Sequence, residues 1–260
     1  MIRKNFYYFV PSCNSFPFIC SLSSFRFFVS FVIFLKFGDF HYFFINFLNI
    51  FFRAFLWWFS YSSDFNFKGE IFYNLEMGIK FAFILFISSE IFFFFSFFWS
   101  YFHFFLSPVL DLGYSWPPRF IKMFNFLDIP LLNTLILLRS GVTVTLAHYY
   151  LLNGCFKFKV FLFFTSLLGF IFSFFQYLEY NNSFFSIRDS SFGTRFFILT
   201  GFHGIHVFIG TLFLSFVLFR SFSFWFKNNR FFRFEVRRWY WHFVDVVWVF
   251  LYFFLYFLGC

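Results

Sequence analysis

Several ionisable side chains lie inside long apolar stretches of this 260-residue sequence. Those whose depth or spacing suits chemistry are Glu90, His148, His203, His206, His242 and Asp245. Burying such a group in a membrane is costly, so its presence indicates a function. Glu90 is the strongest candidate, because it lies near the middle of the stretch 77–106. We predict that Glu90 is either a proton-exchanging carboxyl or a neutral hydrogen-bond partner for another helix or a lipid.

Two histidines, His203 and His206, are three residues apart and therefore share one face of a helix. The glycines around them (Gly201, Gly204 and Gly210) predict close approach of a neighbouring helix. Two histidines one turn apart can ligate a metal. A membrane b-type haem, however, needs a second histidine at matching depth on another helix, and the other histidines lie near the ends of their stretches. We therefore favour inter-helix hydrogen bonding, with Glu90 as one partner, over haem or copper ligation.

A second pair at the same spacing, His242 and Asp245, suits an imidazole–carboxylate interaction on one helix face. Aromatic residues at the start of this stretch are explained by the aromatic belt at a membrane surface. That belt does not explain Asp245, which lies about a turn and a half deeper than Trp239 to Trp241. We expect Asp245 to face protein rather than lipid.

The elements that carry these residues are membrane spans. The chain is 61% hydrophobic and 12% charged, whereas water-soluble domains usually have about 25% charged residues. A helix of about 20 apolar residues crosses the hydrocarbon layer. The segments that meet this length are 16–37, 41–59, 77–106, 127–152, 158–178, 192–219 and 236–258. The sequence therefore predicts an all-α polytopic membrane protein with seven helices in one membrane domain, 1–260.

The positive charges are distributed unevenly between the two sides that seven spans define. Of the 20 Lys and Arg residues, 12 fall on the side of the N-terminus, 5 fall on the other side and 3 (Arg26, Arg53 and Arg139) lie inside spans. Positive residues concentrate on the side from which insertion starts. The N-terminus is thus predicted on the cytoplasmic or matrix side, and a nucleic-acid partner is not favoured. Four scattered cysteines indicate neither a disulfide framework nor a zinc site.

Several motifs occur in an order and at spacings that resemble one family. They are FISSE at 86–90, WPP at 116–118, LNTLILL at 132–138, SGVTVT at 140–145, TGFHGIHV at 200–207 and WYWHFVDVVW at 239–248. Together they resemble subunit III of cytochrome c oxidase, a component of the haem–copper oxidases, over roughly residues 75–260.

This resemblance implies a non-catalytic core subunit of respiratory complex IV in the mitochondrial inner membrane, with the N-terminus in the matrix. It implies a two-helix bundle (16–59) and a five-helix bundle (77–258) that enclose a lipid-holding cleft. The chain would bind no haem or copper and no nucleic acid. Its partners would be the catalytic subunit I, subunit II, accessory subunits and phospholipids, cardiolipin included. Its role would be to support assembly, stability and proton uptake.

The same resemblance assigns roles to individual residues. The family's buried hydrogen-bond and proton network corresponds to Glu90, His148, His203, His206, His242 and Asp245. Its lipid-binding positions correspond to Trp57, Trp58, Glu90, His206 and Arg220. The loop 66–71 departs from the family pattern, which puts headgroup binding there in doubt. Arg139 also departs from it, and inside a helix it should need a carboxylate or a lipid phosphate as partner.

Two other functions remain as alternatives. One is an autonomous proton or ion transporter built around Glu90, the two histidines and Asp245. Such transporters often contain inverted repeats with broken helices, and the two halves of this sequence show no repeat. The other is subunit III of a quinol oxidase, because the electron donor binds other subunits.

Overall fold

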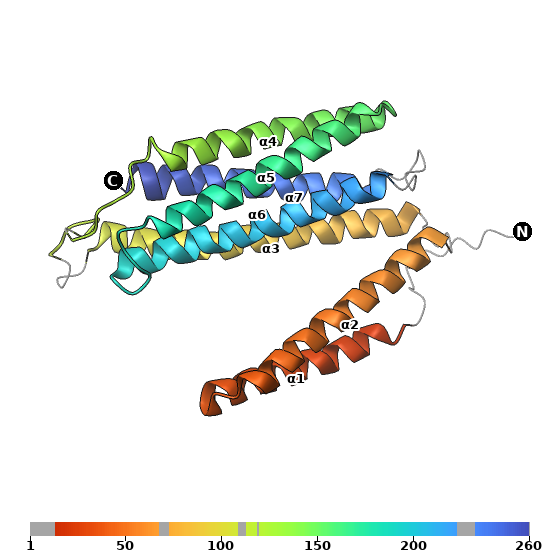
Figure 1. The fold of residues 1–260 in the computed structure, drawn as a ribbon, viewed down its shortest axis with the longest axis horizontal. Coiled ribbons are helices and arrows are strands. Elements are labelled where there is room, and N and C mark those ends of the chain that lie inside the picture. The colour runs from red at the N-terminus through yellow and green to blue at the C-terminus, as the bar shows by residue number, and fades with distance from the viewer. Residues whose placement is uncertain (1–13, 68–72, 109–112, 119, 223–231, 260) are drawn as a thin grey trace, which may run out of the picture. The chain divides into compact units, whose positions relative to one another are not determined.

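The computed structural model describes residues 14–67, 73–108, 113–118, 120–222 and 232–259, and their side chains outside 61–67, 73–76 and 232–233. All regular structure in these ranges is helical (Figure 1). The elements are α1 (Phe16–Phe37), α2 (Phe40–Phe67), α3 (Tyr73–Leu106), α4 (Ile129–Leu152), α5 (Lys157–Asn181), α6 (Ser191–Phe222), α7 (Phe232–Leu251) and the short π-helix η2 (Tyr252–Phe257). In the described part, seven helices are long and apolar enough to cross a membrane. This confirms the predicted fold class.

The predicted spans lie within a few residues of the observed helices, except at polar ends. The second span was predicted to end at 59, whereas α2 continues to Phe67. The last was predicted from 236, whereas α7 begins at Phe232. A helix can extend beyond the hydrocarbon into polar sequence, so hydropathy alone does not mark its ends. The divergent loop 66–71 and the basic residues 227–231 lie largely or wholly outside the described residues.

The chain divides into two compact units, Met1–Ile79 and Lys80–Cys260. In the first unit, α1 and α2 form a hairpin held by phenylalanine rings. The Phe43 ring lies 5.5 Å from Phe27 and 5.4 Å from Phe34, between centroids. Gly38 ends α1 in the left-handed conformation (φ 75°), and its N–H donates to the Phe34 carbonyl. A residue with a side chain would be strained there, so glycine determines this turn.

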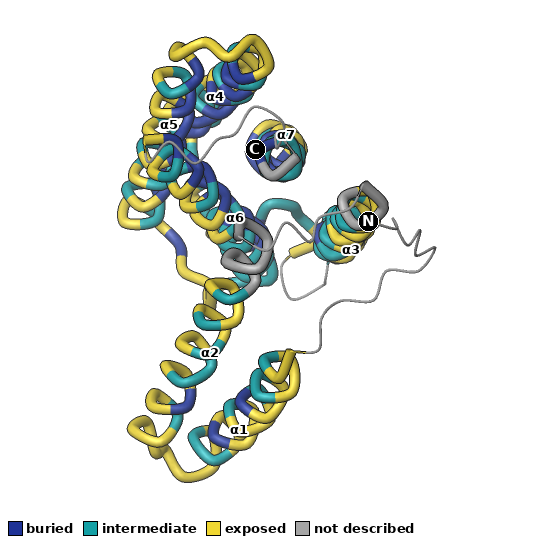
Figure 2. Tube along the Cα trace, turned by 90° about the vertical axis from the view of Figure 1, so that its right-hand side faces the viewer, coloured by how far each residue is buried: buried dark blue, intermediate teal, exposed yellow. Residues whose placement is uncertain are grey.

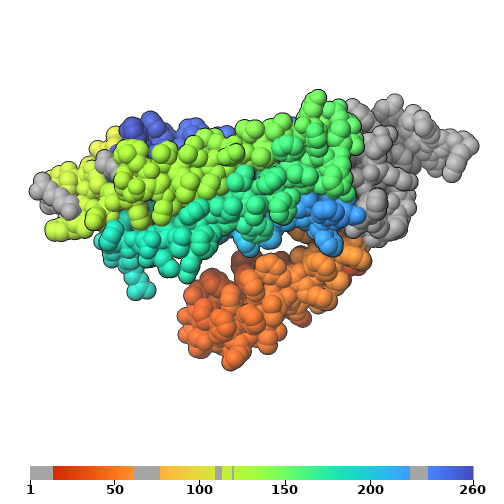
Figure 3. All heavy atoms as spheres, turned by 45° about the horizontal axis from the view of Figure 1, so that its top comes forward, coloured from red at the N-terminus to blue at the C-terminus, as the bar shows by residue number. Residues whose placement is uncertain are grey.

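In the second unit, buried residues gather on the facing sides of α4, α5, α6 and α7 (Figure 2). The space-filling view shows α4 and α5 packed side by side along their lengths (Figure 3). Both apolar and polar side chains join α4 to α5. The Thr143 and Thr165 hydroxyl oxygens are 2.9 Å apart, within hydrogen-bond distance. Such small polar groups are a common means of holding membrane helices together.

Trp241 is the central side chain of this four-helix core. It is fully buried, and its indole N–H donates to Ser140 Oγ of α4 at 2.9 Å. On α5, a Cβ at Gly169 would overlap Thr211 and lie 2.8 Å from the indole. On α6, a Cβ at Gly210 would lie 2.9 Å from the indole. The two glycines therefore make the space that the tryptophan fills.

The close approach expected at three glycines of α6 is observed only at Gly210. Among the described residues, a Cβ at Gly204 would meet no atom within 4 Å, and one at Gly201 would meet only the Tyr180 hydroxyl, at 3.8 Å. The expectation for Gly204 was wrong, because its side of α6 does not face a neighbouring backbone.

Helix α3 contacts the rest of its unit through large side chains. The Phe93 and Phe202 rings are 5.0 Å apart, and Tyr101 donates its hydroxyl hydrogen to the Phe254 carbonyl at 3.0 Å. Arg195 of α6 lies over the Phe104 ring, with its guanidinium carbon 3.5 Å from the centroid. These contacts fix the rotation of α3 and hence the direction of Glu90.

The connection between α5 and α6 is held by Asp189. Its carboxylate accepts hydrogen bonds from the Ser186 N–H at 2.6 Å and the Ser186 hydroxyl at 2.9 Å. Both bonds favour the charged form, and they hold the pKa of the Asp189 carboxyl below its ordinary value.

Replacing Asp189 by asparagine is expected to loosen this turn, because the amide has one acceptor oxygen and no charge. Since the folded pKa is the lower one, the carboxylate's stabilisation is complete above the unfolded pKa of about 3.9 and is lost as the pH falls through the folded pKa. Backbone hydrogen exchange over 183–190 should be faster in Asp189→Asn than in the native chain near pH 7. Asp128→Asn is the control, because Asp128 is exposed and makes no capping bond. Equal exchange in all three would contradict the prediction.

Candidate functional site: buried carboxyl and histidine groups

Glu90 of α3 and His206 of α6 are in direct contact. Glu90 Oε2 lies 2.9 Å from His206 Nε2, and His206 Nδ1 lies 2.7 Å from the Phe202 carbonyl oxygen. A carbonyl oxygen only accepts, so Nδ1 must carry a hydrogen. One further proton then lies between Nε2 and Oε2, in either a neutral acid–imidazole pair or a carboxylate–imidazolium pair. The two side chains therefore hold a single exchangeable proton.

Aromatic rings enclose this pair on the protein side. The His206 ring lies 5.2 Å from Phe94 and 6.2 Å from Tyr240, the latter stacked at 25°. The side chains remain 13% (His206) and 22% (Glu90) exposed. The pair is thus held in an apolar wall while one edge stays exposed at the surface of its unit.

His203 lies in different surroundings, although it was predicted to share a face with His206. It is fully buried and packs against Phe172 of α5 at 5.6 Å and Trp248 of α7 at 5.1 Å. Neither of its ring nitrogens has a hydrogen-bond partner among the described residues. The two histidines therefore do not point to a common site.

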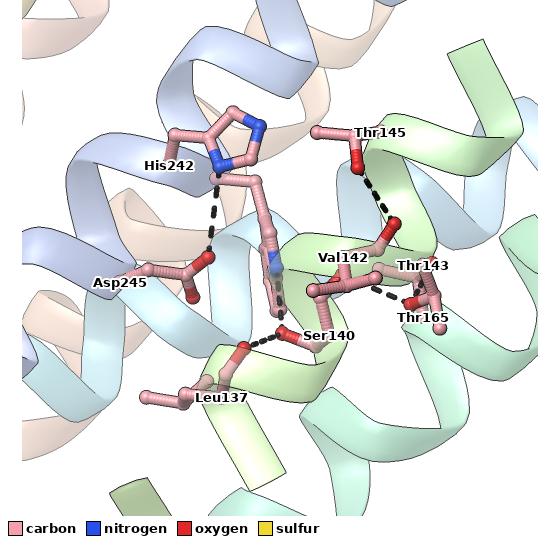
Figure 4. Close-up of polar contacts among 9 residues, drawn as sticks. Leu137, Ser140, Val142, Thr143, Thr145, Thr165, His242 and Asp245 are labelled. Atoms are coloured by element: carbon pink, nitrogen blue, oxygen red, sulfur yellow. Dashed lines mark hydrogen bonds and ion pairs between the residues drawn. The ribbon is translucent and has the colours of Figure 1, made fainter. Parts of the chain in front are cut away.

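His242 and Asp245 of α7 line a groove beside α4 with a volume of about 360 Å³. His242 Nδ1 is 3.8 Å from Asp245 Oδ2, which is longer than a hydrogen bond. Figure 4 shows both side chains facing the α4 segment from Ser140 to Thr145. Gly141 makes room for the carboxylate, since a Cβ there would lie 2.8 Å from Asp245 Oδ2. Asp245 is 6% exposed and so faces protein, as expected.

His148 belongs to a third group, near one end of α4 and α7. Its Nδ1 lies 3.0 Å from a guanidinium nitrogen of Arg238, which can only donate. Its Nε2 is 4.0 Å from Glu235, and Glu235 is 3.4 Å from Lys80 of α3. This group connects α3, α4 and α7 through mixed charges. The six residues predicted as one network thus form separate groups: Glu90 with His206, His203 alone, His242 with Asp245, and His148 with its ion partners.

The predicted lipid-binding residues lie in both units. Trp57 and Trp58 belong to Met1–Ile79, and they are 37% and 65% exposed. Arg220 belongs to Lys80–Cys260 and is half-buried near the end of α6, with its guanidinium carbon 5.7 Å from the Phe216 ring centroid. Arg139 is exposed in the middle of α4, with neither an ion pair nor a hydrogen bond to any described residue.

One buried carboxyl was missed in the sequence. Glu179 of α5 is 1% exposed and accepts a hydrogen bond from the Tyr256 hydroxyl at 2.5 Å. The predicted span ends at 178 and leaves Glu179 outside it, whereas α5 continues to Asn181. If the predicted helix is extended by one turn, Glu179 falls on the same face as Phe172 and Gln176, which are buried.

Comparisons with known proteins identify the family of the chain. The family model described as cytochrome c oxidase subunit III matches residues 5–260. Curated relatives named cytochrome c oxidase subunit 3 are 51% identical in Drosophila melanogaster, 50% in Aedes aegypti and 48% in Coturnix japonica. Each match covers 204 residues, which is 78% of this chain and 78% of the relative. The chain belongs to the cytochrome c oxidase subunit III family.

Proposed function

We propose that this chain, as a subunit of the cytochrome c oxidase complex, performs no redox chemistry itself and supports the assembly, stability and proton uptake of the catalytic subunit. The haem and copper of the complex would be held by partner subunits. The two histidines best placed by sequence for a metal, His203 and His206, point to different neighbours. The three relatives given above are named for cytochrome c oxidase, which does not favour the alternatives of an autonomous transporter and a quinol oxidase subunit.

The observation that carries the proton-supporting role is the Glu90–His206 contact. It holds one proton at a position deep in a span, between two helices. Within such a pair the proton can shift between the carboxyl oxygen and the imidazole nitrogen without movement of the heavy atoms.

For partners, we propose subunit I as the main contact, together with subunit II and accessory subunits. Apolar side chains cover the outer faces of the helices, where they suit lipid tails or other transmembrane helices. Arg139 supports a further polar contact there, because an unpaired cation in mid-span needs a carboxylate of another subunit or a lipid phosphate. Arg220 would bind a phospholipid phosphate, cardiolipin included. In the first unit, Trp57 and Trp58 would also contact lipid. The membrane would be the mitochondrial inner membrane, with the N-terminus in the matrix.

A native gel of membranes in mild detergent tests the assembly part of this proposal. The chain is tagged, its position is located by blotting, and the gel is scanned for haem absorbance and stained for oxidase activity. We expect the chain in a large haem-containing band with oxidase activity. Migration as a small band free of haem would contradict the proposal, and proton flux in liposomes would then test the transporter.

A further inference from the structure

Four buried side chains form a polar row through the second unit, and its α6 member points about 60° away from His206 around the helix. They are His203 of α6, Trp248 of α7, Tyr256 of η2 and Glu179 of α5. Each is at most 1% exposed. We refer to these four residues as the buried polar row. None of the contacts that hold Glu90 involves them.

The members of the buried polar row follow one another in space. The His203 ring lies 5.1 Å from Trp248, and the Trp248 ring lies 6.1 Å from Tyr256, between centroids. The Tyr256 hydroxyl donates to Glu179 Oε1 at 2.5 Å. Residues far apart in the sequence therefore bring a carboxyl, a phenol, an indole and an imidazole together in an otherwise aromatic core.

This row has more hydrogen-bonding capacity than the surrounding protein satisfies. Both ring nitrogens of His203, the Trp248 N–H and Glu179 Oε2 have no hydrogen-bond partner among the described residues. An imidazole offers at least one donor, an indole one donor and a carboxyl oxygen at least one acceptor. Polar groups this deeply buried are nearly always hydrogen-bonded, to protein or to ordered water.

Trp241 provides a comparison in the same core, because its indole N–H is hydrogen-bonded. It is as fully buried as Trp248, but its N–H donates to Ser140 Oγ at 2.9 Å. The two tryptophans lie seven residues apart on α7 and both pack among α5 and α6 side chains. They differ in whether the protein supplies a partner, so burial alone does not explain the unpaired N–H of Trp248.

We propose that the buried polar row is an internal hydration site, in which bound water molecules bridge His203, Trp248 and Glu179. A buried water typically makes about three hydrogen bonds, and the row offers donors and acceptors at intervals along its length. Such waters join α5, α6 and α7 through hydrogen bonds that direct side-chain contacts do not supply. The site is separate from the Glu90–His206 pair and goes beyond the proposed function, which does not require it.

X-ray radiolysis with mass spectrometry tests this on the purified, assembled oxidase. Radicals formed from bound water oxidise adjacent side chains even when these are buried. We expect Trp248 to be oxidised several-fold faster than Trp241, although both have the same exposure. Equal and slow oxidation of the two tryptophans would overturn the proposal, because a dry row gives Trp248 no local source of radicals.

Two histidine variants on α6 provide a matched comparison. His203→Phe removes both imidazole nitrogens from the row, and we expect the oxidation of Trp248 to fall several-fold toward that of Trp241. His206→Phe makes the same change one turn along the helix, on the Glu90 side, and should leave Trp248 oxidation at its native rate. Unchanged Trp248 oxidation in His203→Phe would overturn the assignment of that water to this row. If either variant fails to assemble, the comparison of Trp248 with Trp241 in the native complex decides the question.

Discussion

Replacing Trp241 by alanine is expected to destabilise the five-helix unit by about 3–5 kcal/mol, the usual cost of truncating a buried tryptophan. The indole fills the space made by Gly169 and Gly210 and is bonded to Ser140. Alanine would leave a cavity among four helices, and the Ser140 hydroxyl would lose its donor. Since native stability is typically only about 5–15 kcal/mol, we expect little of the variant to accumulate in the assembled complex.

The amount of chain in the native oxidase band, relative to total chain synthesised, measures this effect. Trp99→Ala is the matched control, because Trp99 lies on α3 and is 68% exposed, so its loss leaves no cavity. We expect near-native assembly for Trp99→Ala and severe loss for Trp241→Ala. Equal assembly of the two variants would show that the Trp241 contact is not central to the core.

Replacing Glu90 by alanine is expected to have the second-largest effect, at about 1–3 kcal/mol for a polar partner left unsatisfied. His206 Nε2 would lose its only described partner, while Nδ1 stays bonded to the Phe202 carbonyl. The pair is 13% (His206) and 22% (Glu90) exposed, so the unsatisfied imidazole nitrogen is not fully enclosed and we place the cost toward the lower end of that range. Glu90→Gln should cost less, since its amide can donate to Nε2.

The relative stability of these variants is measured by the temperature at which the chain dissociates from the detergent-solubilised complex. We expect it to decrease from the native chain to Glu90→Gln and then, by a larger step, to Glu90→Ala. Glu235→Gln is a useful comparison, because it removes another carboxyl of the same unit. The ion pairs of Glu235 are partly exposed and therefore contribute little to stability. If Glu90→Gln were as unstable as Glu90→Ala, the carboxylate charge itself would be structural.

The membrane topology could be predicted from the sequence because apolar length is a local property. Seven stretches matched seven helices, and Gly38 marks a helix end through its own backbone conformation. Packing could not be predicted in the same way. Nothing near Gly169 in the sequence indicates that it faces Trp241, and Gly204, which has the same local appearance as Gly210, faces open space.

Only part of the candidate site could be predicted, because the local sequence shows which polar residues lie in a span but not which residues they contact. A buried carboxyl in a span draws attention wherever its partner is, so Glu90 was found. The choice between His203 and His206 as its partner could not be made, because residues three apart on a helix differ by only about 60° in direction. That difference turns His206 toward α3 and His203 toward α5 and α7. Glu179 was missed because the predicted span ended at 178, whereas α5 continues to Asn181.

Proton uptake coupled to oxygen reduction, measured in the purified oxidase containing Glu90→Gln, tests the central claim most directly. The glutamine keeps a hydrogen bond to His206 but holds no exchangeable acid proton. With subunit composition unchanged, we expect slower proton uptake per enzyme than in the native complex, and native rates in the Glu235→Gln control. Native proton uptake in a fully assembled Glu90→Gln complex would contradict the claim that the Glu90–His206 pair supports proton uptake.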